Sequence, residues 1–277
     1  MPRYTRAQVQ RRRRIAAAIL AALVLLLIGG CSALIALVAG GGSAHEAGST
    51  ADPAELVVPT TAADAPALAQ LPAGDALAAG EVIGIDVSAH RGAIDWEAVR
   101  GDGIAFAYVK ATEGVGHADA RFDANWKGAD DAGIARGAYH YFTLCSPGAD
   151  QAEAFLAAAP PDDAALPPVV DLELDSNCTE RPTATEAKAE VDAFVAAVEK
   201  GWGRRVVVYS SREWRDLYPL PEEVDRPRWA TSHGERPDGT WQVWQVRFDA
   251  RVDGIDGDVD LDVLKVEELR TASALAA

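Results

Sequence analysis

Val169-Val170-Asp171-Leu172-Glu173-Leu174-Asp175 is the stretch around which the chain is organised. Two β-branched residues followed by acids alternating with leucines indicate a buried strand that becomes polar at its carboxyl end. Side chains two apart on a strand point the same way, so Asp171, Glu173 and Asp175 are expected to share one face. Crowded carboxyl groups raise the pKa of at least one of them, which keeps a proton available near neutral pH. The alternative is an exposed acidic strand end, and the surrounding sequence decides between the two.

The chain on both sides of this stretch alternates between strand and helix patterns. After residue 210 the helical signal weakens and only short strands remain. Such alternation favours a parallel sheet, and eight strands favour its closure. We therefore predict an α/β fold, an incomplete TIM-like (β/α)5β3 barrel, with an open doubly wound sheet as the alternative. The predicted strands are 82–88, 104–110, 135–142, 169–175, 205–210, 228–231, 241–246 and 259–263, and the predicted helices are 94–99, 122–132, 149–158 and 185–200, the second ended by Gly133 and the last by Gly201.

The first 80 residues predict a membrane tether. Residues 1–14 contain six arginines and no acid, and residues 15–38 are almost wholly apolar and long enough to cross a bilayer. The arginines place the N-terminus in the cytoplasm, so the main domain, residues 81–270, is expected outside it as part of a single-pass cell membrane protein. Residues 39–80 are rich in small residues and predict a flexible, disordered linker. Secretion after signal cleavage, or lipidation at Cys31, are the alternatives.

Charge and cysteine content narrow the class of protein further. The net charge is −16, and the chain beyond the arginine-rich residues 1–14 carries −22, which argues against a nucleic-acid partner. Cys145 and Cys178 each follow a predicted strand. In an oxidising compartment such a pair favours a disulfide over a metal site. Residues 271–277 are expected to form a short tail.

Polar and aromatic side chains gather where the predicted strands end, which is where barrel enzymes build their sites. Asp86 ends the first strand and Asp260 lies on the eighth, so both converge with the acidic fourth strand in a closed barrel. Carboxylates beside aromatic rings are typical of a sugar-cleaving cleft, because rings stack on sugar faces and acids perform glycosidic chemistry. Taken singly, each has a structural alternative, such as a core tryptophan or a hydrogen-bonded core histidine. The candidate substrate-binding residues are Lys110, Glu113, Tyr139, His140, Tyr141, Tyr209, Trp229, Trp244 and Gln245.

Six motifs in this order resemble glycoside hydrolase family 25, the Chalaropsis-type lysozymes or N-acetylmuramidases. The resemblance extends from about residue 82 to about residue 264, and it implies the same (β/α)5β3 barrel. The motifs are Gly84-Ile85-Asp86-Val87-Ser88, Lys110-Ala111-Thr112-Glu113-Gly114, Gly137-Ala138-Tyr139-His140-Tyr141-Phe142, Asp171-Leu172-Glu173, Trp244-Gln245 and the run Gly254-Ile255-Asp256-Gly257-Asp258-Val259-Asp260-Leu261-Asp262.

The resemblance implies a peptidoglycan hydrolase that cuts the β-1,4 bond between N-acetylmuramic acid and N-acetylglucosamine in cell-wall remodelling. Glu173 matches the family's general acid, Asp171 the carboxylate that assists it, and Asp86 and Asp260 the other two cleft acids. It also implies a route in which the N-acetyl group of the substrate is the nucleophile and Asp171 orients it. We expect no metal or organic cofactor, peptidoglycan strands as partner, and a monomer. The alternative is a catalytically inactive module that binds wall glycan and is tethered to the membrane.

Three departures from the family's pattern concern the sugar subsites. His90-Arg91 stand where the family usually shows an aromatic residue and glutamine. Thr231-Ser232-His233 follow Ala230 where a tyrosine is usual, and Val246 replaces an aromatic residue after Gln245. All three departures leave the four acids in place in the sequence, so they bear on the sugar subsites and the substrate preference and not on the reaction.

Overall fold

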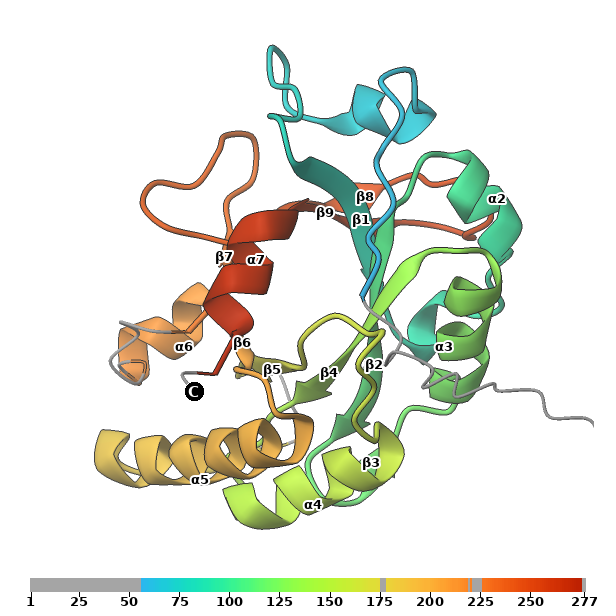
Figure 1. The fold of residues 1–277 in the computed structure, drawn as a ribbon. Coiled ribbons are helices and arrows are strands. Elements are labelled where there is room, and N and C mark those ends of the chain that lie inside the picture. The colour runs from blue at the N-terminus through green and yellow to red at the C-terminus, as the bar shows by residue number, and fades with distance from the viewer. Residues whose placement is uncertain (1–55, 175–177, 219, 221–225, 276–277) are drawn as a thin grey trace, which may run out of the picture. The chain divides into compact units, whose positions relative to one another are not determined.

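The computed structural model describes residues 56–174, 178–218, 220 and 226–275, and its centre is a closed barrel of eight strands (Figure 1). Neighbouring strands are parallel, except that β9 runs antiparallel to both β8 and β1. Pairing of β1 with β2 closes the barrel, and β3 adds a short hairpin arm to β2. The predicted α/β barrel is confirmed. Its strands are β1 (Glu81–Val87), β2 (Phe106–Glu113), β3 (His117–Ala118), β4 (Ala135–Tyr141), β5 (Val169–Leu172), β6 (Val207–Ser210), β7 (Arg228–Thr231), β8 (Val243–Ala250) and β9 (Val259–Lys265).

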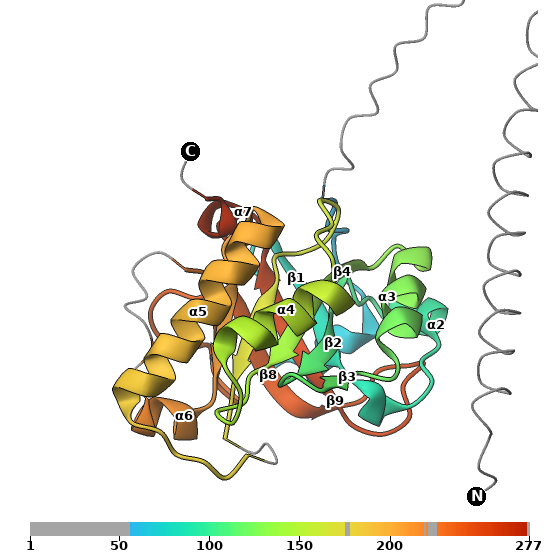
Figure 2. The same ribbon diagram turned by 90° about the horizontal axis from the view of Figure 1, so that it is seen from below.

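Helices follow the strands in the first part of the barrel, and one more helix, α7, follows the last strand. A helix comes after each of β1, β2 with its β3 arm, β4, β5 and β6, whereas no α-helix separates β7, β8 and β9 in the described residues. In Figures 1 and 2, α4 and α5 lie side by side on one flank of the barrel. The helices are α2 (Trp96–Gly101), α3 (Phe122–Asp131), α4 (Gly148–Ala158), α5 (Ala184–Trp202), α6 (Arg212–Leu217) and α7 (Val266–Ser273), with 3-10 turns η2 (Pro66–Gln70) and η3 (Ala89–Arg91).

Helix α5 shows how local sequence sets the boundaries. Thr183 and Glu186 form a reciprocal capping box at its start. The helix was predicted to end at Gly201, but it continues to Trp202 and ends at Gly203, which has a positive φ of 66°. Gly201 serves packing instead, because an added Cβ there would lie 2.8 Å from the side chain of Leu156 on α4. The sequence therefore located the end of the helix to within two residues. Only the left-handed backbone conformation of Gly203 shows which of the two glycines ends it.

Two glycines allow aromatic rings to fill the barrel interior. A Cβ on Gly84 would lie 2.3 Å from the ring of Phe106, and one on Gly137 would lie 2.2 Å from the ring of Tyr108. Both rings are fully buried. The interior below the strand ends is thus packed with side chains, as in other small barrels, and the outer faces of the strands pack against the helices.

Residues 56–80 are not the flexible linker that their composition predicts. Leu71 and Leu77 pack on the outer face of β8 and β9, next to Trp241 and Trp244, where no helix covers the barrel. Arg236 bonds to Asp75 and Glu81 and so joins the loop before β8 to this segment. The small residues misled the prediction because they suit close packing as well as disorder. We call residues 56–80 the N-terminal strap.

The predicted membrane anchor at 15–38 and the linker up to residue 55 lie outside the described residues. Among the residues that the structure does describe, no helix is both long and apolar enough to span a bilayer.

Candidate active site

A pocket of about 290 Å³ opens at the carboxyl end of the barrel strands. Its walls come from six different strands and from the residue that follows β5, so the closure of the barrel is what assembles it. Acids, aromatic rings and one amide share the lining. The lining residues are Asp86, Tyr139, Val169, Asp171, Glu173, Tyr209, Trp229 and Gln245.

Asp171 and Glu173 form a pair of carboxyl groups on one wall of the pocket. β5 ends at Leu172, so Asp171 is the last inward residue of the strand and Glu173 follows it. Burial raises the pKa of Asp171 well above its usual value, and the charges of Glu173 and Asp86 raise it further, while Lys110 opposes them. Asp171 therefore keeps its proton to higher pH than a solvated carboxyl group does. Asp175, predicted on the same face, lies outside the described residues.

Asp86 and Asp260 form a second acidic pair, directly opposite each other in the register of β1 and β9. Gln245 donates a hydrogen bond from Nε2 to Asp86 Oδ2 at 3.3 Å. Burial, and next the charge of Asp260, raise the pKa of Asp86. Burial also raises the pKa of Asp260 to about 6, against the opposing charge of Arg91, whose guanidinium lies 3.6 Å from its carboxylate. The predicted convergence of acids from strands one, four and eight is therefore present.

Aromatic side chains form the rest of the wall. Trp229 packs against Tyr209 with ring centroids 5.7 Å apart, and Tyr209 donates its hydroxyl proton to Gln245 at 3.3 Å. Burial raises the pKa of Tyr139 and of Tyr209, so both hydroxyl groups stay neutral. The structure thus brings Tyr139, Tyr209, Trp229 and Gln245 together as predicted.

Lys110, Glu113 and Tyr141 lie next to the acids without lining the pocket itself. Lys110 Nζ bonds to Glu113 Oε2 at 2.7 Å and lies 4.7 Å from the centre of the Tyr141 ring. Its charge acts on Asp171. The three residues form a charged border of the site, and Lys110 is its buried member.

His140 and Trp244 were predicted to bind substrate, and the structure contradicts both predictions. His140 is fully buried outside the barrel, stacked on Phe194 with centroids 4.6 Å apart. It hydrogen-bonds to Thr112 and Gln151, and burial lowers its pKa to about 4, so it is a neutral core residue. Trp244 is equally buried, under the N-terminal strap, and donates to the Ser232 carbonyl.

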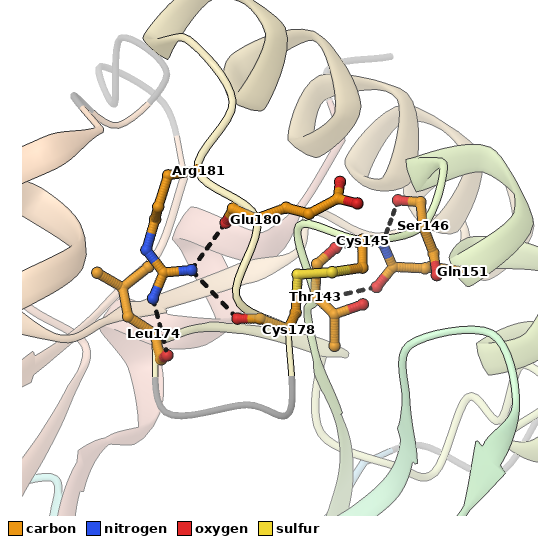
Figure 3. The surroundings of a disulfide bond; sticks show 8 residues. All are labelled: Thr143, Cys145, Ser146, Gln151, Leu174, Cys178, Glu180 and Arg181. Carbon is orange, nitrogen blue, oxygen red and sulfur yellow. Dashed lines mark hydrogen bonds between the residues drawn. A yellow bond between two sulfur atoms is a disulfide. The ribbon is translucent and has the colours of Figure 1, made fainter.

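A disulfide joins Cys145 and Cys178, the two cysteines that the sequence paired (Figure 3). It links the loop after β4 to the loop after β5, which begins at Glu173. Arg181 adds backbone contacts to this region through the carbonyl groups of Leu174, Cys178 and Glu180. The disulfide therefore fixes the covalent frame next to the acidic pair.

Three residues of the site had no role in the sequence-based prediction. Arg91 was noted only as a departure from a motif, and it pairs with Asp260. Thr231 lies beside Tyr209, where burial raises the pKa of the hydroxyl group and Thr231 opposes that rise. Asp262, two residues after Asp260, is fully buried below it. The strand period of two could have found Asp262, because it places Asp260 and Asp262 on one face.

The comparisons with known proteins agree with one another. The model of the glycosyl hydrolases family 25 matches residues 85–255. Lysozyme M1 of Streptomyces globisporus is 35% identical over 195 residues, which cover 65% of this chain and 66% of that protein. A family 25 glycosyl hydrolase from Bacillus anthracis is similar in structure, with a TM-score of 0.64 and 30% identity over 72% of this chain and 95% of the other. A bacterial lysozyme from Streptomyces coelicolor is also similar in structure, with a TM-score of 0.57 and 32% identity over 65% of this chain and 90% of the other.

Proposed function

This chain belongs to glycosyl hydrolase family 25, and from that membership and its pocket we propose that it is a lysozyme acting on peptidoglycan. The bond cleaved is the β-1,4 link between N-acetylmuramic acid and N-acetylglucosamine. One observation carries the proposal: three carboxyl groups, Asp86, Asp171 and Glu173, line a single pocket walled by aromatic rings, and a fourth, Asp260, lies opposite Asp86 in the strand register. Relatives that match well are named as lysozymes or, in Arthroderma benhamiae, as an N,O-diacetylmuramidase.

The pair Asp171 and Glu173 supplies the proton that the reaction needs. Glu173 is the more exposed of the two and faces the pocket, so it is placed to protonate the leaving glycosidic oxygen. Asp171 is deeper and is the group whose burial favours the neutral form. As Glu173 gives its proton to the leaving oxygen and the glycosidic bond breaks, the carbonyl oxygen of the substrate's N-acetyl group bonds to the anomeric carbon, and Asp171 is placed to orient that group.

Asp86 and Asp260 lie across the barrel from Asp171 and supply negative charge in their ionised forms. An oxocarbenium-like transition state is positive at the sugar ring, so carboxylates that face it stabilise it more than the neutral substrate. Tyr139, Tyr209 and Trp229 offer ring faces for sugar contacts in the same pocket. The two acidic pairs therefore divide the work between proton transfer and charge stabilisation.

The apolar residues 15–38 support a position at the cell membrane, with the barrel on the outer side and the organism's own wall as substrate. A disulfide beside the pocket fits an oxidising compartment. N-terminal sequencing of the exported protein tests this part: an intact N-terminus supports the anchor, and a new one after residue 38 or at Cys31 refutes it.

The test of the activity is a digest of purified peptidoglycan by the full chain in detergent, compared with Glu173→Gln. Loss of a general acid typically lowers the rate by 10²-fold or more, so we expect no measurable release by the variant. Reduction of the products followed by mass spectrometry must show reduced muramic acid at the new ends. Reduced glucosamine would refute the bond assignment. Glu213→Gln, an exposed change on α6, is the matched control and should cut like wild type.

A binding module that has lost catalysis is the second candidate, and the departures at His90, Arg91 and Thr231 are what favours it. It predicts that wild type sediments with wall sacculi and releases nothing. The complete set of four acids speaks for the enzyme.

A further inference from the structure

Asp262 occupies a second layer of the barrel interior, below the pocket. On β9 it lies two residues beyond Asp260, so the two side chains share the inward face. The register places Asp260 opposite Asp86, and Asp262 opposite Gly84 on β1 and Gln245 on β8. Gly84 has no side chain, and the ring of Phe106 occupies the place where one would lie, so no side chain of β1 separates Asp86 from the layer of Asp262.

The carboxyl group of Asp262 lacks the partners that an ionised group needs. It is 0% exposed, and neither of its oxygens accepts a well-aligned hydrogen bond from any described residue. An ionised carboxylate can only accept, and burying one without donors or a cation is among the costliest arrangements in a protein interior. A protonated carboxyl group, in contrast, brings its own donor.

The groups around Asp262 come from four other strands and offer no compensating positive charge to it. Asp86 on β1 and Asp260 on β9 are acids, Tyr108 on β2 carries a neutral hydroxyl, and Gln245 on β8 is an amide. Trp229 on β7 lies close enough to lower the pKa of Asp262, but its indole N–H makes no well-aligned hydrogen bond to the carboxyl group. Burial raises the pKa of Asp262 well above its usual value, and the charges of Asp86 and Asp260 raise it further.

We propose that Asp262 is a positioning residue, whose protonated carboxyl group donates its hydrogen to the carboxylate of Asp86. Asp86 then receives two donors, the Asp262 O–H from below and the Gln245 N–H from β8. Two donors on different strands fix the plane of the carboxylate and favour its charged form. Asp262 touches no substrate, and its effect on the reaction, which rests on the proposed function, passes through Asp86.

The test compares Asp262→Asn with Asp262→Leu in the full chain. The amide of asparagine can still donate to Asp86, whereas leucine has a similar size and no donor. We expect Asp262→Asn to keep kcat on peptidoglycan within about threefold of wild type. Asp262→Leu should lower kcat by tenfold or more with KM little changed. The acid limb of the pH profile of kcat for Asp262→Leu should also move to higher pH, because Asp86 without its hydrogen-bond donor protonates more readily.

A substrate-free measurement separates this inference from the activity. Infrared difference spectra at neutral pH should show a protonated carboxyl band in wild type that Asp262→Asn removes, while Asp102→Asn, a buried change outside the pocket, leaves that band in place and kcat unchanged. No lost band, or a tenfold loss of kcat in Asp262→Asn, overturns the inference. If Asp262→Leu does not fold, Asp262→Asn decides alone. If wild type cuts no peptidoglycan, the proposed function fails and the band still decides where the proton lies.

Discussion

Arg91 sets the charge state of the acid nearest the rim of the pocket. Its guanidinium opposes the burial that raises the pKa of Asp260 to about 6. In Arg91→Met, Asp260 should therefore protonate more readily, and the acid limb of kcat/KM should move to higher pH by about half to one unit. A pH profile on peptidoglycan measures it. Arg212→Met removes a cation whose side chain is 84% exposed and should leave the profile in place. If the acid limb of kcat/KM stays at the same pH in Arg91→Met, then the protonation of Asp260 does not set that limb.

Single residues also show where the sequence-based site was right and where it went wrong. Tyr139 and Tyr141 are two apart and His140 lies between them, so one strand cannot turn all three toward a pocket. The same holds for Trp244 and Gln245, which are neighbours. These residues were predicted together because they belong to the same motifs. Alternation along each strand instead turns Tyr139 and Gln245 toward the pocket and His140 and Trp244 away from it. Asp262 was overlooked for the opposite reason, since alternation favours it and no motif gave it a role.

The N-terminal strap does for β8 and β9 what helices do for the earlier strands. A soluble fragment 81–277 lacks Leu71 and Leu77 and would leave the apolar face around Trp241 and Trp244 open to water. We expect it to aggregate or to unfold at lower temperature than fragment 56–277, because burying two leucines even in part contributes about 2 kcal/mol. Thermal unfolding measures this, and equal melting temperatures would contradict it. Leu71→Asp should reproduce the loss within 56–277, and Val57→Asp, at a 76% exposed position, should not.

The disulfide between Cys145 and Cys178 stabilises the loops after β4 and β5. Replacing Cys145 and Cys178 by serine opens a loop that spans 33 residues, which should lower the free energy of unfolding by about 3 kcal/mol. It should also lower kcat, since the segment after Glu173 loses its covalent link to the β4 loop. Denaturant unfolding and peptidoglycan digests measure the two effects. Cys31→Ser removes the remaining cysteine and should change neither. A double variant as stable and active as wild type would show that the link is dispensable.

Elements with a long, regular pattern could be predicted from the sequence, as could the short strand 228–231, whereas two short helices could not. The helix 185–200 and the strand 135–142 have strong periods, and the structure contains both within two residues at each end. Helices α6 and α7 are six and eight residues long, too short for the apolar period to stand out, and both were missed. The strap was missed for a different reason, because contacts far along the chain and not its own sequence hold it.

At the scale of the whole molecule, the buried acids make stability depend on pH. The folded pKa values of Asp86, Asp171 and Asp262 are raised, so their contribution is full below the unfolded value of about 4 and is lost as pH rises through the folded values. His140 acts the other way, because its folded pKa of about 4 lies below the unfolded 6.5. Its contribution is lost as pH falls from about 6.5 to about 4.

Above pH 6.5 only the acids remain in play, so the free energy of unfolding should decline there as pH rises. Each proton involved contributes a slope of at most about 1.4 kcal/mol per pH unit. The Asp262→Asn variant has one buried acid fewer, so its free energy of unfolding should fall less steeply as pH rises. Denaturant titrations between pH 6.5 and 9 check this, and parallel curves for the two proteins would rule out Asp262 as a contributor.

The strap also shortens the length of chain that could serve as a tether. If residues 15–38 span the membrane as proposed, only residues 39–55, seventeen in all, lie between that span and the folded part, in place of the forty-two expected from composition. Whatever its conformation, a chain of that length reaches at most about 60 Å. The pocket would then cut only glycan strands in the shell of wall closest to the cell surface, and the newest strands would be within its range before older ones.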